Sequence, residues 1–295
     1  MNKDITIIFV IYKSGNILFE NLKSLKNFPI IVIDNDPKSL IQSYLLSLDN
    51  NITYFKMFSN IGMAKAANHA FEKVQTNFFL YLTADTLIKE NDILNLLKIY
   101  KKYDNVGLSC PIHLDKKNNY KGNYFCNPVK RIIKRNQFQK RLYKSLSKIL
   151  PSGDFSVDTV WGAPILLKKS IIKKIGFFDE NFFMFFEDVD LCDRLKKNNF
   201  EIIETPTAIC HHHQDTTFPK SIKHLYITIT SYKFSELYYF SKHNYRHVLR
   251  VYIHSFDYFF RFILNIFLFN KKKILTNLFR LIGIIRYIFY KKTKS

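Results

Sequence analysis

Acidic residues and phenylalanines alternate through residues 176–194 (GFFDENFFMFFEDVDLCDR), inside a chain whose formal net charge is +21. We expect the aromatic run of Phe182, Phe183, Phe185 and Phe186 to be largely buried. This run would carry Glu187, Asp188 and Asp190 to the floor of a pocket. Burial raises the pKa of a carboxyl group and suits the carboxylate to general-base catalysis. The alternative role is structural, with Asp188 capping a helix that begins near Val189.

Other candidate residues stand where predicted strands end. Asp34 closes the run IVIDND, where it either accepts a hydrogen bond from the base or ribose of a nucleotide or forms the turn before Pro37. Asp85 closes the run NFFLYLTADT, where it either holds Mg²⁺ or Mn²⁺ against phosphates or caps the next helix. Three successive histidines, residues 211–213, follow a late strand, and they supply either a metal ligand or surface side chains.

A glycine and several alanines mark the start of a predicted helix in residues 60–68 (NIGMAKAAN). Small residues at this position allow the backbone to approach a diphosphate at the helix N-terminus. The segment has neither the GxGxxG pattern nor the P-loop lysine, so it matches no standard dinucleotide or ATP motif. Taken alone, it indicates a phosphate site only weakly.

The elements that must position these residues alternate in type. Short apolar runs predict strands at residues 5–11, 29–36, 52–58, 77–86, 106–111, 164–167 and 201–210. Segments whose apolar residues have helical spacing lie between the first of these strands. This alternation predicts right-handed βαβ units and an α/β fold. Ligands collect at the carboxyl ends of such strands, and Asp34 and Asp85 stand there.

Chain length and composition allow one large α/β domain with an appendage. We predict a catalytic domain at residues 1–219, with a basic insertion at about 115–150, and a C-terminal region at 220–295. The four cysteines lack CxxC spacing and are expected to be reduced thiols, as in a cytosolic protein. The first residues read as a strand and not as a signal peptide.

Positive charge is concentrated in the insertion and in the C-terminal region, whose only acids after residue 215 are Glu236 and Asp257. Such basic, aromatic-rich segments fit either a nucleic acid or an anionic membrane surface. The insertion is either a loop over the site or solvated surface. The C-terminal helices carry too many charges to span a bilayer, so they either attach to a lipid interface or cap the catalytic domain, and we expect a mixture of both.

Together these motifs resemble the family 2 glycosyltransferases of bacterial polysaccharide synthesis, especially the rhamnosyltransferase-like branch. FVIYKSGN is similar to the family's opening strand and turn, and IVIDND to its nucleotide-binding aspartate strand. NIGMAKAANHA resembles the family's N-x-G-F-small-x-small-N segment, and GFFDENFFMFFEDVDLCDR resembles its acceptor-side motif G-x-F-D-E…E-D-x-D-x-x-x-R. The donor-side residues that the resemblance marks are Tyr12, Asp34, Asn60, Gly62, Ala64, Asn68, Thr83 and Asp85.

The resemblance implies a GT-A fold, a nucleotide-sugar donor, Mg²⁺ or Mn²⁺, and inversion at the anomeric carbon. It makes Asp85 the remaining acid of a metal motif that here reads Thr83-Ala84-Asp85, and it places His212 near the metal, with His211 or His213 as substitutes.

On the acceptor side, the resemblance makes Asp188 the general base that deprotonates the acceptor hydroxyl. Glu187 and Asp190 would then orient that hydroxyl or support the loop.

The sequence therefore predicts an inverting glycosyltransferase that uses a dTDP-rhamnose-like or UDP-linked donor. Its acceptor is expected to be a lipid-linked or oligosaccharide precursor of a cell-surface glycan, at the cytoplasmic face of the inner membrane. The oligomeric state is left open, a homo-oligomer included. The alternatives are a nucleic-acid-binding protein, for which the chain has no recognised motif, and a non-catalytic glycan-assembly protein, against which Asp85 and Asp188 argue.

Overall fold

The computed structural model of the protein describes residues 4–13, 16–48, 51–115, 119–120, 151–160, 162–212, 221–244 and 247–294. The predicted basic insertion at about 115–150 lies outside this set, except for residues 115, 119 and 120.

Two compact units make up the chain. The first contains residues 1–179 and 188–217, and the second contains residues 180–187 and 218–295. The short segment 180–187 thus groups with the C-terminal helices, although it is flanked on both sides by the first unit. The sequence patterns did not predict that residues 180–187 belong to the second unit.

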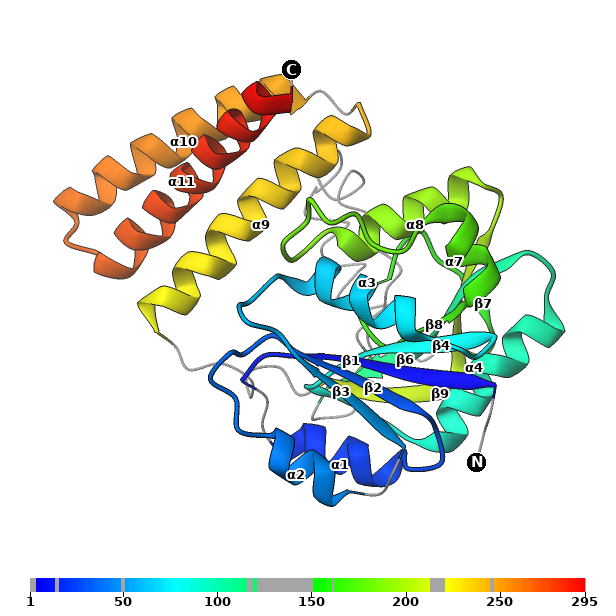
Figure 1. Cartoon of the computed structure of the whole chain (residues 1–295). Coiled ribbons are helices and arrows are strands. Elements are labelled where there is room, and N and C mark those ends of the chain that lie inside the picture. Colours follow the sequence, from blue (N-terminus) through cyan, green and yellow to red (C-terminus); the bar gives the residue numbers. More distant parts are fainter. Residues whose placement is uncertain are drawn as a thin grey trace. The chain divides into compact units, whose positions relative to one another are not determined.

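A mixed sheet forms the centre of the first unit (Figure 1). Its strands, in order across the sheet, are β3 (Ile52–Lys56), β2 (Ile30–Asp34), β1 (Ile5–Ile11), β4 (Phe78–Thr83), β8 (Ile165–Lys168), β6 (Val106–Leu114), β9 (Glu201–His212) and β5 (Thr86–Ile88), and β7 (Phe155–Ser156) pairs with β9. Strands β1 to β4 are parallel, whereas β8 runs antiparallel to both β4 and β6. The run predicted as one strand at 77–86 is two strands, and Asp85 lies in the turn between them.

Helices cover both faces of this sheet. They are α1 (Asn16–Ser24), α2 (Gln42–Ser47), α3 (Met63–Lys73), α4 (Glu90–Lys102), α7 (Lys169–Ile175) and α8 (Glu187–Lys197). The alternation of side chains along β4 shows how the faces divide. Leu80 and Leu82 lie in the main core cluster with residues of α1 and α4, whereas Phe79 packs its ring against Phe71 of α3 and against Phe177. Accordingly, α1 and α3 lie on opposite sides of the sheet in Figure 1.

The second unit contains the helices α9 (Ile222–Lys242), α10 (His247–Phe267) and α11 (Lys271–Lys294), which confirms the prediction of C-terminal helices. Its core is built around Leu237, Ile284 and Tyr287. Gly283 lets α11 approach α9 closely, because a Cβ there would lie 2.8 Å from the carbonyl oxygen of Thr230. Among the described residues, no helix combines the length and the apolar composition that a membrane crossing requires.

Candidate active site

The carboxyl ends of the parallel strands meet at one edge of the sheet. In the register of the ladder, Ile11 pairs with Asp34, Asp34 pairs with Lys56, and Val10 pairs with Thr83. The polar residues that follow β1, β2 and β4 therefore gather at this edge, as a βαβ arrangement requires. Tyr12 comes directly after β1 and is half-buried, with the ammonium group of Lys13 5.5 Å from its ring centroid.

Asp34 is buried at this edge, and both of its carboxylate oxygens accept hydrogen bonds. The main-chain N–H of Asp36 donates to Oδ1 over 2.9 Å, and the hydroxyl of Tyr54 donates to Oδ2 over 3.0 Å. Burial, followed by the bond to Asp34, raises the pKa of Tyr54, so the phenol stays a donor. The turn-forming role of Asp34 is thus observed. Each oxygen has a further lone pair that can accept a hydrogen bond from a nucleotide. The nucleotide-binding role therefore stays open as a prediction.

The turn before α3 is held by two side-chain amides. The Oδ1 of Asn60 accepts the N–H of Gly62 over 3.0 Å, and the Nδ2 of Asn35 donates to the carbonyl oxygen of Gly62 over 3.0 Å. Gly62 has φ 88°, a left-handed conformation that favours glycine. Ala64 is fully buried and lets α3 lie close to the sheet. The predicted small-residue segment therefore shapes the start of this helix.

Asn35 is a residue that the motif reasoning passed over. Its side chain is buried, and within the described part of the chain its Oδ1 has no hydrogen-bond partner. The signal in the sequence was the unusual run of three polar residues, Asp34, Asn35 and Asp36, directly after an apolar strand.

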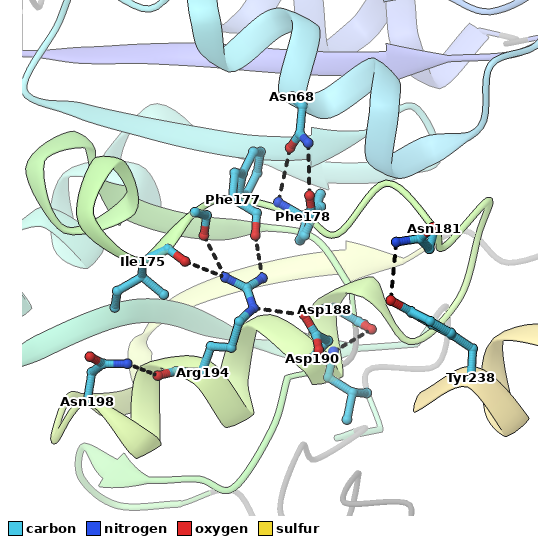
Figure 2. Close-up of polar contacts among 12 residues, drawn as sticks. Asn68, Ile175, Phe177, Phe178, Asn181, Asp188, Asp190, Arg194, Asn198 and Tyr238 are labelled. Atoms are coloured by element: carbon cyan, nitrogen blue, oxygen red, sulfur yellow. Dashed lines mark hydrogen bonds and ion pairs between the residues drawn. The ribbon is translucent and has the colours of Figure 1, made fainter. Parts of the chain in front are cut away.

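Asn68 bonds to the main chain of Phe178, and its predicted donor-binding role stays a prediction. Its Nδ2 donates to the carbonyl oxygen of Phe178 over 2.8 Å, and its Oδ1 accepts the N–H of the same residue over 3.0 Å (Figure 2). The ring of Phe178 stacks on Phe177 with centroids 4.0 Å apart. Asn68 therefore ties α3 to the start of the acidic segment, where it positions main chain.

The half-buried Asp85 lies in the turn between β4 and β5. The hydroxyls of Thr83 and Thr86, on either side of it, are 3.0 Å apart. In the antiparallel pairing of β5 with β9, Thr86 pairs with His212. The backbone of His212, the predicted histidine ligand, thus lies beside that of Thr86. Thr86 directly follows Asp85, the predicted acidic ligand. The family resemblance implied this proximity, whereas the residues alone did not, because the two are far apart in the chain.

The described residues contain no metal site built from protein ligands alone. Within the described ranges, no group of three or more His, Cys, Asp or Glu side chains could hold an ion. His211 pairs with Leu87 in the same ladder, and His213 lies outside the described residues. A site with one or two protein ligands fits a divalent cation that takes its remaining oxygens from substrate phosphates.

Asp188 is half-buried in the first turn of α8, which begins at Glu187 and not near Val189 as the capping alternative supposed. The main-chain N–H of Gly162 donates to its Oδ2 over 2.7 Å, and the N–H of Val189 donates to its Oδ1 over 2.8 Å. Burial raises the pKa of the Asp188 carboxyl, and these N–H groups offset only part of that rise. Each oxygen keeps a lone pair, so the group can accept a proton.

Asp190 belongs to a clamp centred on Arg194. The Nε of Arg194 is 2.8 Å from Oδ2 of the fully buried Asp190. Its other nitrogens donate to the carbonyl oxygens of Ile175 (3.1 Å), Gly176 (2.7 Å) and Phe177 (Figure 2). The guanidinium thereby fastens the start of the acidic segment to α8. The two roles predicted for Asp190, at the acceptor hydroxyl and in support of the loop, both stay predictions.

The phenylalanines of the segment are less uniformly buried than predicted. Phe182 and Phe186 are buried, and Phe183 and Phe185 are half-buried.

Within the second unit, Asn181 donates to the hydroxyl of Tyr238 over 3.2 Å and accepts from that of Tyr290 over 2.9 Å. The main-chain carbonyl of Met184 accepts from Ser235.

Strain accumulates in the segment immediately before the acids. Phe185 and Phe186 both have φ 70°, an uncommon conformation for bulky residues that is found mostly where surrounding contacts enforce it. Glu187, the half-buried first residue of α8, follows directly.

The mixed sheet with helices on both faces has the GT-A fold of solved glycosyltransferase structures. Residues 6–176 match the family Glycosyl transferase family 2, and the chain belongs to that family. The predictions of fold, family and enzyme class are thereby confirmed.

Two relatives and one solved structure illustrate the match. An uncharacterized glycosyltransferase, RT0329 of Rickettsia typhi, is 30% identical over 185 residues, which are 60% of this chain and 54% of the relative. The dTDP-rhamnosyl transferase RfbF of Shigella flexneri is 23% identical over 66% of this chain and 64% of its own length. The chain thus spans 54% and 64% of the length of these two relatives. The mannosyltransferase PcManGT of Pyrobaculum calidifontis, solved with GDP-Man and Mn²⁺, shares the fold with a TM-score of 0.54 at 15% identity, over 81% of this chain and 63% of that one.

Proposed function

We propose that this glycosyltransferase inverts the anomeric centre of a nucleotide-diphospho-sugar as it transfers the sugar to a hydroxyl of a cell-surface glycan precursor. The environment of Asp188 is the observation that carries the proposal. A carboxylate held by two main-chain N–H groups, with a pKa raised by burial, has both a fixed direction and the basicity that a general base needs.

In the proposed step, the acceptor oxygen bonds to the anomeric carbon while the bond from that carbon to the diphosphate oxygen breaks. The proton of the acceptor hydroxyl passes to Asp188, and the bonding electrons leave with the nucleoside diphosphate. Direct displacement needs no enzyme nucleophile. Glu187, next to the base in α8, would orient the hydroxyl, and the clamp of Asp190 and Arg194 would hold the loop.

The donor would lie at the carboxyl edge of the sheet. Asp34 would accept from the base or ribose, and the turn that Asn60 and Gly62 form before α3 would face the diphosphate. Tyr12 and Thr83 flank this edge, after β1 and at the end of β4. Ala64 contributes by its small size and Asn68 by the hold it keeps on Phe178.

Asp85 and His212 would hold Mg²⁺ or Mn²⁺ together with the phosphates of the donor. The bound cation supplies charge neutralisation on the departing diphosphate. The pairing of Thr86 with His212 supports this assignment, because it brings the two candidate ligands into one region of the fold. With so few protein ligands, we expect weak metal binding before the donor arrives.

A dTDP-rhamnose-like donor is favoured over a UDP-sugar by the similarity to the dTDP-rhamnosyl transferase RfbF. For the acceptor we propose a lipid-linked or oligosaccharide precursor at the cytoplasmic face of the inner membrane. Residues 1–219 would form the catalytic domain and residues 220–295 the basic region that keeps the enzyme near the acceptor. The charge of that region supports the assignment.

The test is the release of nucleoside diphosphate by the purified chain from a panel of dTDP-, UDP- and GDP-sugars, with and without Mg²⁺ or Mn²⁺. Asp188→Asn should lower kcat roughly 10²–10⁴-fold while KM for the donor stays within a small factor. Because burial raises the pKa of Asp188, the acidic limb of the wild-type pH profile should lie above the ordinary aspartate value of about 3.9.

Asp193→Asn is the matched control, because Asp193 lies on the same helix and changes by the same group. The base assignment fails if Asp188→Asn and Asp193→Asn have the same kcat. An absence of turnover with every donor, and of any thermal stabilisation by a donor, would instead favour the non-catalytic alternative.

A further inference from the structure

The helix α10 presents an apolar stripe to solvent. Its large apolar residues recur at helical spacing, and several are more than half exposed, for example Tyr252 (71%), Phe256 (68%) and Phe267 (74%). The exposed members are Val248, Leu249, Tyr252, Ile253, Phe256, Phe259, Phe260, Ile263, Leu264, Ile266 and Phe267. An exposed patch of this extent marks an interaction site on a folded protein.

The opposite face of α10, which packs on α9 and α11, is the more polar one. Lys233 of α9 is only 3% exposed and pairs with Glu236, and the Nδ1 of His254 on α10 lies 3.8 Å from the same carboxylate. Asn265 of α10 is also buried, and Tyr258 receives the cation of Lys233 on its ring. The unit thus directs polar groups of α10 inward and leaves the apolar stripe outside, the reverse of an ordinary surface helix.

Positive charge borders this stripe. Three exposed lysines, residues 271–273, begin α11, directly after the exposed Leu268 and Phe269. Exposed Arg286, Lys291 and Lys292 accompany exposed apolar residues on α11. The two acids of the region are both engaged, since Glu236 pairs with Lys233 and Asp257 lies 2.7 Å from Arg261.

From this arrangement we infer that α10 binds the surface of an anionic membrane, with its apolar stripe at the acyl boundary and the lysines 271–273 at the headgroups. Apolar residues on one face with lysines beside them are the composition that favours a helix in the plane of the interface. A second copy of the chain fits less well, because two surfaces of high positive charge would meet. The inference stands on α9, α10 and α11 alone and does not depend on glycosyl transfer.

Co-sedimentation of the full chain with vesicles tests it, using phosphatidylcholine alone and phosphatidylcholine mixed with phosphatidylglycerol, at low and high salt. We expect binding to the mixed vesicles that weakens with salt. Phe256→Gln/Phe260→Gln should weaken it at least tenfold, and Lys271→Gln/Lys272→Gln/Lys273→Gln on the order of tenfold to a hundredfold.

Matched controls come from the first unit. Leu40→Gln/Phe58→Gln removes two exposed apolar side chains there, and Lys101→Gln/Lys173→Gln/Lys174→Gln removes three exposed lysines. Circular dichroism checks that each variant folds. Equal binding by the α10 variant and its control would overturn the inference. So would a dimer in light scattering that the α10 variant dissociates while vesicle binding is absent, because the stripe would then bind a second copy.

Discussion

The clamp of Arg194 offers a quantitative test of how the acidic segment is held. Arg194→Met removes the cation that pairs with Asp190, whose side chain is fully buried, and the donors to three main-chain carbonyls. Breaking a buried ion pair from one side costs about 3–5 kcal/mol, because the remaining charge is left in a poorly solvated place. We therefore expect the free energy of unfolding to fall by about that amount.

Urea unfolding followed by circular dichroism is the assay. Asp190→Asn completes a double-mutant cycle: the double variant should lose about 0.5–3 kcal/mol less than the sum of the single variants, since the two side chains interact directly.

Lys102→Met serves as the control. Lys102 also lies 2.7 Å from a carboxylate, that of Asp154, but the Lys102 side chain is 61% exposed and the Asp154 side chain 5% exposed. Without Lys102, Asp154 still accepts hydrogen bonds from the hydroxyls of Tyr103 and Thr205, so we expect a smaller loss. Strictly additive losses in the cycle, or an Arg194→Met variant as stable as the Lys102→Met variant, would refute the clamp.

Two further predictions concern the close contacts of each unit. Gly283→Ala should destabilise the second unit by about 1–3 kcal/mol in thermal or urea unfolding followed by circular dichroism, because its Cβ would lie 2.8 Å from the carbonyl oxygen of Thr230; Gly153→Ala, where a Cβ meets nothing within 4 Å, should have no such effect. Asn68→Ala should lower the free energy of unfolding by about 1–3 kcal/mol, because it leaves the main chain of Phe178 without its two partners. A variant of Asn68 that keeps full stability but loses donor affinity would instead support the donor-binding role predicted from the sequence.

Much of the fold was accessible from local patterns. The run Ile5–Ile11 is buried throughout and became β1 with the predicted bounds. Asp34 stands at the end of β2, as expected from the apolar run before it. Such runs determine strands because they can be buried on both faces only within a covered sheet.

The order and direction of strands across the sheet could not be predicted from local sequence patterns. The antiparallel insertion of β8 between β4 and β6 has no local signature, and neither does the division of residues 77–86 into β4 and β5. The placement of residues 180–187 with the C-terminal helices depends on contacts such as that between Asn181 and Tyr290, which are 109 residues apart.

For the site, the sequence alone determined which side chains have suitable chemistry: carboxylates at strand ends, a glycine before a helix, and Asp188 within an acidic segment. Only the tertiary structure decided their partners. It assigned Asn68 to the main chain of Phe178, Asp190 to Arg194 and the Gly162 N–H to Asp188. The physical reason is that residue type fixes what a group can donate or accept, whereas burial and direction, which set its pKa and its partner, come from chain segments distant in sequence.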